Sequence, residues 1–139
     1  MSVVFDTNTW VSALQFGLRK DGSPSTPLQA LLQTLSTDRI AMCEEIRAEV
    51  IRVLSAKFCW EFARASQIID EWLEGSHTVT IAGELRACRD PADNMFLECA
   101  LNANDALVVT GDQDLLALDP FQGIRIITPR DYISTGSVT

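Results

Sequence analysis

Residues 90–118 read DPADNMFLECALNANDALVVTGDQDLLAL, and the first half of this stretch predicts a helix with a carboxylate near its start. Asp90 is a favourable helix N-cap. Pro91 suits the first helical position, because an N–H at that position makes no hydrogen bond within the helix and proline has none. At about 100° per residue, Asp93 lies in line with the apolar stripe of this helix, which includes Phe96. The stretch therefore places an acidic side chain beside a face that we expect to be buried.

The second half of the stretch predicts a buried strand that ends in acidic residues. Residues 106–110, ALVVT, form a short apolar run between Asp105 and Gly111, a pattern typical of a strand covered on both faces. Asp112 and Asp114 follow where that strand ends, which is a common ligand position in an open α/β sheet. Capping or turn formation explains any one of these aspartates alone, so a functional interpretation depends on the rest of the chain.

The chain has 139 residues, of which 47% are hydrophobic, and these values predict one globular domain over residues 1–139. No apolar run approaches the roughly 18–20 residues that span a bilayer, so we expect no membrane association. The start of the chain, MSVVFD, is too short and too acidic for a signal peptide, which favours a cytoplasmic location.

The net charge of −8 argues against broad electrostatic binding to DNA or RNA. It does not exclude nucleic acid, because carboxylates that converge on divalent cations lose part of their negative charge in the working state. A protein this acidic that acts on RNA is expected to recognise a short single-stranded or loop segment.

Strands and helices alternate along the chain. The pattern predicts strands at residues 2–5, 39–42, 79–81, 106–110 and 124–128. Helices are expected after residue 6, from residue 27, over residues 44–57, within residues 58–74 and from residue 91, and the final ISTGSVT is predicted to be a frayed tail. This alternation is typical of a single-domain, three-layer α/β/α fold with a mainly parallel sheet of about five strands.

The helix over residues 44–57 carries a second candidate acid. Its apolar stripe includes Val50 and Val53, and Glu49 lies one step from that stripe, where it can border a buried cleft. Glu45 is the second choice, one helical turn earlier. A solvated Glu49 that pairs with Arg52 three residues later is the structural alternative.

The carboxylates of Asp6, Asp93 and Asp112 are all predicted to face one rim of the sheet, and Glu49 reaches the same rim from its helix. Four carboxylates in one cleft repel one another, and such a cluster is costly unless cations compensate it. Oxygen ligands without cysteine or histidine favour hard ions, Mg²⁺ or Mn²⁺. Such ions can activate water and stabilise the leaving oxygen of a phosphodiester, which suits a chain without a good side-chain nucleophile.

Four segments carry a resemblance to a known family: VVFDTNTWVSAL (3–14), CEEIRAEVIRVLSAKF (43–58), the stretch from 90 to 116 and IITPRDYI (126–133). In their order and spacing these segments resemble the PIN-domain nucleases. The resemblance implies that the family's four acids correspond to Asp6, Glu49, Asp93 and Asp112, as catalytic and metal-binding residues. It also implies that the residues matching accessory positions near the site are Asn8, Thr110 and Asp114.

Within that family, the chain is most similar to the VapC-like toxin components of type II toxin–antitoxin pairs. This resemblance implies an Mg²⁺-dependent or Mn²⁺-dependent endoribonuclease with an RNA substrate, a small antitoxin partner and a homodimeric assembly. Residues 58–74 contain Trp60, Phe62 and Trp72, which is more aromatic surface than one helix face needs, and we expect the partner surface there.

Two other functions compete with this interpretation. A haloacid-dehalogenase-type phosphotransferase needs a second aspartate two positions after the first, and Asn8 stands there. A non-catalytic PIN-like protein that only binds a partner has no need to keep a repulsive set of four acids. The sequence does not decide between Glu45 and Glu49 as the second acid.

Overall fold

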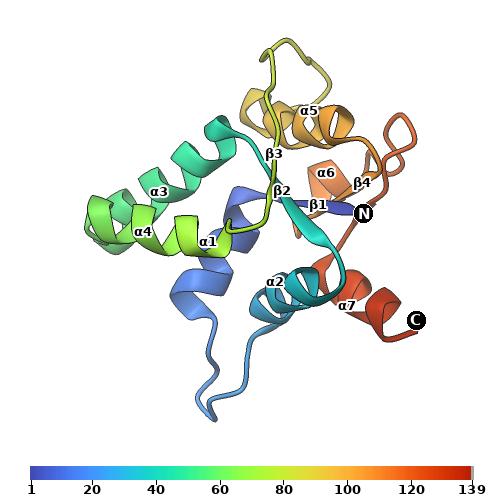
Figure 1. Ribbon diagram of the computed structural model, residues 1–139. Coiled ribbons are helices and arrows are strands. Elements are labelled where there is room, and N and C mark those ends of the chain that lie inside the picture. Colours follow the sequence, from blue (N-terminus) through green and yellow to red (C-terminus); the bar gives the residue numbers. More distant parts are fainter. Residues whose placement is uncertain (139) are drawn as a thin grey trace.

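The computed structural model describes residues 1–138 and confirms the predicted fold class (Figure 1). Within these residues, five parallel strands form one sheet in the order β3-β2-β1-β4-β5. The strands are β1 (Ser2–Phe5), β2 (Arg39–Met42), β3 (His77–Thr78), β4 (Ala106–Val109) and β5 (Ile126–Ile127).

Helices cover both faces of the sheet and give the fold its three layers. They are α1 (Thr7–Phe16), α2 (Thr26–Thr37), α3 (Glu44–Phe58), α4 (Phe62–Trp72), α5 (Asn94–Ala103), α6 (Gln113–Leu116) and α7 (Pro129–Val138). Figure 1 shows α5 on one side of the strands and α2 and α7 on the other. None of the helices in the described part of the chain is long and apolar enough to cross a membrane.

Strands β1 and β4 lie side by side and set the geometry of the candidate site. Their register pairs Ser2 with Ala106 and Phe5 with Val109, and all four residues of β1 are buried. Because the strands are parallel, the residues that follow Phe5 and Val109 emerge together at the carboxyl edge of the sheet. The Asp6 N–H accordingly donates to the Val109 carbonyl at 3.3 Å.

The chain reverses its winding direction at this pair of strands. After β1 it crosses to β2 on one side, and after β4 it crosses to β5 on the other side. The two connections diverge and leave a crevice at the carboxyl ends of the strands, which is where open α/β sheets bind their ligands.

Helix α5 begins three residues later than the sequence predicts. Asp90 caps the start as expected, since its Oδ1 accepts a hydrogen bond from the Ala92 N–H at 3.0 Å. The next residues form a single 3-10 turn, η1 (Pro91–Asp93), before the α-helix starts at Asn94. The tighter turn leaves Asp93 at the helix start, beside the carboxyl edge of the sheet, and the predicted apolar face, which includes Phe96, is buried.

The third strand lies earlier in the chain than predicted. β3 ends at Thr78, so the predicted strand over residues 79–81 is wrong. The Val79 N–H still donates to a β2 carbonyl at 2.8 Å, but the next carbonyl, that of Thr80, accepts a hydrogen bond from Asn102 of α5. The apolar residues of this segment are buried without strand pairing, so their pattern indicated burial rather than a sheet.

The end of the chain also differs from the prediction. Only Ile126 and Ile127 of the predicted strand 124–128 pair with β4, because Ile124 pairs back with Phe121 in a tight bridge. The frayed tail is wrong, because residues 129–138 form α7, while Thr139 lies outside the described residues.

Helix α7 is held against the protein by its capping residue and by one buried ring. Thr128 Oγ1 accepts a hydrogen bond from the Asp131 N–H at 3.1 Å, which satisfies a free donor of the first turn. Tyr132 is buried against Phe5, and its hydroxyl donates to Asp38 at 2.8 Å. The sequence pattern did not predict this helix, because the segment is mostly polar apart from its anchor Tyr132 and so lacks the apolar stripe that indicates a helix.

The aromatic side chains of residues 58–74 are less free than the sequence suggests. Trp60 is partly buried, and its Nε1 donates to Gln15 at 2.7 Å. Trp72 packs edge-on against the buried Trp10. Phe62, at 68% exposure, stays open to solvent, so the case for a partner surface here now depends mainly on this residue.

Candidate active site

Asp6 is a buried carboxylate held in one orientation from both oxygens. It caps α1, with Oδ1 accepting from the Thr9 N–H at 2.9 Å, and Oδ2 accepts from the Thr110 hydroxyl at 2.5 Å. Only 4% of Asp6 is exposed. Burial raises its pKa above the usual range, and the hydrogen bonds from Thr110 and Thr9 oppose this rise.

Thr110 links the ends of the two central strands. Its hydroxyl donates to Asp6 and accepts a hydrogen bond from the Asp112 N–H at 3.0 Å. The side chain is completely buried, so its hydroxyl has no competing water. Thr110 thus fixes the orientation of Asp6 and the position of the backbone at Asp112 together.

Asp93 and Asp112 form an acid pair beside Asp6. Burial, then a hydrogen bond between the two carboxyl groups, and then the negative charge of Asp112 raise the pKa of Asp93 to about 7. The charges of Asp90 and Asp6 raise it further. Negative charges close to a carboxyl group disfavour its ionised form, which is why the pKa of Asp93 rises. The structure therefore brings together three of the four acids predicted from the sequence.

A cleft of about 660 Å³ opens at this edge of the sheet. Its wall includes Asp6, Asp112 and the predicted accessory residues Asn8 and Asp114. The Asp114 N–H donates to Asp112 Oδ1 at 3.0 Å, which caps the short helix α6 and fixes that carboxylate. Asn8 and Asp114 are exposed, so their side chains are accessible from the cleft.

The fourth predicted acid, Glu49, forms an ion pair with Arg52. Both its oxygens accept hydrogen bonds from Arg52, at 2.7 and 2.9 Å, and this contact lowers the pKa of Glu49. The sequence-based alternative of an i,i+3 ion pair is therefore present. Glu45 is exposed, and its charge acts on the buried thiols of Cys43 and Cys99. Helix α3 packs on α1, which begins directly after Asp6, but neither glutamate lines the cleft beside Asp6.

The donor set of the acid cluster suits a hard divalent cation. Among residues 1–138, no three His, Cys, Asp or Glu side chains are arranged so that they could hold a metal ion as they stand. Oxygen-only ligands favour Mg²⁺ or Mn²⁺. By their chemistry, the three aspartates fit such an ion.

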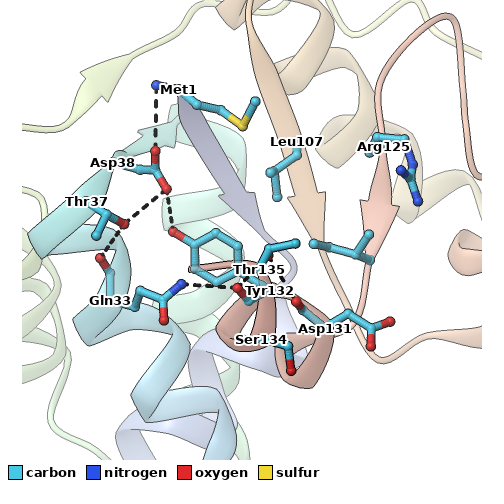
Figure 2. A pocket seen from close by; sticks show the side chains of 11 residues that line it. Met1, Gln33, Thr37, Asp38, Leu107, Arg125, Asp131, Tyr132, Ser134 and Thr135 are labelled. Carbon is cyan, nitrogen blue, oxygen red and sulfur yellow. Dashed lines mark hydrogen bonds and ion pairs between the residues drawn. The ribbon is translucent and has the colours of Figure 1, made fainter. Parts of the chain in front are cut away.

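A larger cavity, of about 690 Å³, lies at the opposite edge of the sheet (Figure 2). It lies near the amino ends of the strands, where Asp38 and Arg125 precede β2 and β5. Figure 2 shows the Tyr132 hydroxyl bonded to Asp38, and Gln33 reaching the Tyr132 carbonyl. These groups fasten α7 to α2, and none of the four predicted acids lines this cavity.

Two buried polar residues of α5 were missed by the sequence analysis. Asn94 is 6% exposed and Glu98 is 8% exposed, and both bind the backbone of the loop before η1. Their spacing of four residues within a mostly apolar helix was the available signal.

The fold and the acid cluster together define an α/β protein with its site at the switch point of a parallel sheet. The model of the PIN-domain family matches residues 2–114, and the chain belongs to that family. PIN domains are generally nucleases and typically use divalent metal ions, so the chain has a nuclease fold whose substrate is nucleic acid. A search of curated proteins finds no match to the chain.

The raised pKa of Asp93 predicts a pH dependence of stability in the absence of metal ions. The folded protein keeps a proton up to a pH of about 7, whereas the unfolded chain loses it near the ordinary value of 3.8. The folded state therefore binds more protons between these values, and its stability falls as the pH rises through this window.

The measurement is thermal melting in EDTA at pH 5 and pH 8. We expect the wild-type Tm to fall more between these pH values than the Tm of Asp93→Asn, which carries no titrating group at this position. Equal falls in both proteins would show that Asp93 does not titrate in this window.

Proposed function

We propose that this protein is a divalent-metal-dependent endoribonuclease. The observation that carries the proposal is the convergence of aspartates at the switch point of the sheet, where Asp6 and Asp112 line one cleft and both charges act on the neighbouring Asp93. A cluster of partly buried carboxyl groups with raised pKa values is unfavourable for a protein that has no use for it. A divalent cation would compensate the negative charge of these carboxylates, so the same cluster would serve as its binding site.

Each aspartate has a proposed role that follows from its position. Asp6 and Asp93 are the central ligands of Mg²⁺ or Mn²⁺, and Asp112 completes the site directly or through a water molecule. When bound, the ion supplies an activated water and stabilises the leaving oxygen of the phosphodiester. Thr110 keeps Asp6 in its orientation, a function that hydrogen-bonding partners of metal ligands commonly serve.

Glu49 is the proposed fourth acid, for a second ion or for orienting the attacking water. Its ion pair with Arg52 is partly exposed, with 33% of the glutamate and 62% of the arginine side chain accessible. Exposed pairs of this kind contribute only about 0–1 kcal/mol, so the carboxylate can exchange Arg52 for another partner at little cost.

The proposed substrate is a short single-stranded or loop segment of RNA. The protein is strongly acidic, which disfavours long-range binding along a duplex. The cleft presents the polar side chains of Asn8, Ser12 and Gln113, which can hydrogen-bond to sugar hydroxyls. A 2′-hydroxyl is the group that distinguishes RNA from DNA at such a site.

The biological role we propose is that of a VapC-like toxin in the cytoplasm, paired with a small antitoxin and with a second copy of itself. The resemblance over residues 3–14, 43–58 and 90–116 supports this role. The exposed Phe62 is the residue of α4 most available for such a contact.

The function is tested with single-stranded RNA and DNA of the same sequence, labelled at the 5′ end and incubated with Mg²⁺ or Mn²⁺. We expect cleavage of the RNA and an intact DNA strand. The products should lack 2′,3′-cyclic phosphates, because water rather than the 2′-hydroxyl attacks. Cyclic phosphate ends would contradict the proposed chemistry, and cleavage of the DNA alone would contradict the proposed substrate.

A further inference from the structure

Three side chains of α5 bind the loop that leads from β3 to η1. Asn102 donates to the Thr80 carbonyl at 2.9 Å, and Glu98 accepts from the N–H groups of Gly83 and Leu85 at 2.8 and 3.1 Å. Asn94 Oδ1 accepts from the N–H groups of Ala87 and Cys88, both at 2.9 Å. These side chains are each four residues apart, so they form one stripe along the helix. We call this set of bonds the loop ladder.

The loop ladder supplies hydrogen-bond partners to backbone groups of a loop that has no secondary structure of its own. Residues 79–90 form no helix or strand, and buried N–H groups without partners are costly. Helix α5 runs antiparallel to the loop. The start of the loop therefore binds Asn102 near the end of the helix, and the end of the loop binds Asn94 at the start of the helix. The last contact of the loop, at Cys88, lies two residues before Asp90.

Asn94 is the contact that bears most directly on the acid cluster. Its Oδ1 holds the loop before Asp90, while its Nδ2 donates to the Pro91 carbonyl at 3.1 Å. One buried amide thus clamps the backbone on both sides of Asp90. Asn94 directly follows Asp93 in the chain, so the amide also restrains the backbone from which the Asp93 carboxylate projects.

We propose that Asn94, supported by Glu98, is a positioning residue that holds Asp93 in place for cation binding. This inference rests on the proposed function, because it assigns Asp93 as a metal ligand. In the alternative, the ladder only stabilises the loop, and its members affect folding without affecting the site. A positioning role predicts that a substitution at Asn94 lowers the affinity for the cation, whereas a purely structural role predicts an unchanged affinity.

The test compares two matched variants, Asn94→Ala and Asn102→Ala, by titration calorimetry with Mn²⁺. Each removes one asparagine amide from the same stripe without changing the charge, but Asn94 is next to Asp93 and Asn102 lies at the far end. We expect Asn94→Ala to bind Mn²⁺ about tenfold more weakly or worse, since loss of a residue that orients a ligand typically costs 10–100-fold. Asn102→Ala should stay within about twofold of the wild type, because its contact lies two ladder steps from the site.

Amide hydrogen exchange in the wild-type protein provides a second test that does not depend on how well a variant folds. Coupling between two sites is reciprocal, so a ladder that favours cation binding must itself be stabilised by the cation. Saturating Mg²⁺ should therefore slow the exchange of the Ala87 and Cys88 N–H groups.

The outcomes separate this inference from the proposed function. If the wild type binds Mn²⁺ through Asp93, but both asparagine variants bind it equally well and exchange at Ala87 and Cys88 ignores Mg²⁺, the ladder is only structural and the inference is wrong. If the wild type does not bind Mn²⁺, or binds it as tightly after Asp93→Asn, the proposed function itself fails and the inference falls with it.

Discussion

Asp6→Asn is expected to reduce RNA cleavage by a factor of about a hundred or more while the protein remains folded. Changes to residues that only orient a metal ligand already cost about 10–100-fold, and Asp6 is proposed as a ligand itself. Asparagine is as good a helix N-cap as aspartate, and its carbonyl can accept the Thr9 N–H bond. The variant also removes a buried carboxylate whose ionised form burial disfavours.

Thermal melting is the control for this prediction. The Tm of Asp6→Asn should stay close to that of the wild type, because the fall in repulsion offsets the loss of the hydrogen bond that the Thr110 hydroxyl donates to Asp6. A folded Asp6→Asn variant that cleaves RNA at the wild-type rate would exclude Asp6 from the metal site. Thr110→Val, which removes the hydroxyl that orients Asp6 but keeps the side-chain volume, should give a smaller loss of cleavage.

The second large effect is expected at α3, where Glu49→Gln should lower cleavage by about tenfold or more. Glu45→Gln is the matched control, because it makes the same change one helical turn earlier, and it should stay within about twofold of the wild type. The difference follows from position, since Glu49 borders the buried stripe of α3 whereas Glu45 is exposed in the first turn.

Arg52→Ala sharpens this comparison, because it releases Glu49 from its ion pair without removing the carboxylate. Cleavage by Arg52→Ala should equal or exceed that of the wild type. A large loss in Glu45→Gln together with wild-type cleavage by Glu49→Gln would show that the second acid lies one turn earlier than we propose.

Strands and helices with strong local patterns were predictable from the sequence. Residues 2–5 and 39–42 form strands at the expected bounds, because each is a short apolar run closed by polar residues. The helix predicted at 44–57 extends one residue further, to Phe58. The segments that failed depend on distant partners. The carbonyl of Thr80 binds Asn102 of α5 in place of a strand partner, and α7 is anchored by Tyr132 on α2.

The candidate site was predictable in its position but not in its internal contacts. Asp6 and Asp112 follow strands, and the topology of a parallel sheet places such residues together. The place of Asp93 beside Asp112 depends on the 3-10 turn before α5, which the sequence pattern does not distinguish from a helix start. Asn94 was missed because helical periodicity treats a buried position as an apolar one.

The central claim is that RNA cleavage requires a divalent cation held by the three aspartates. The most direct measurement follows cleavage of one single-stranded RNA while the wild-type protein is given Mg²⁺, then excess EDTA, then Mg²⁺ again in excess over the chelator. The account predicts cleavage, arrest and recovery in that order, and no cleavage by Asp93→Asn at any stage. Cleavage that continues at an unchanged rate in EDTA would contradict the account.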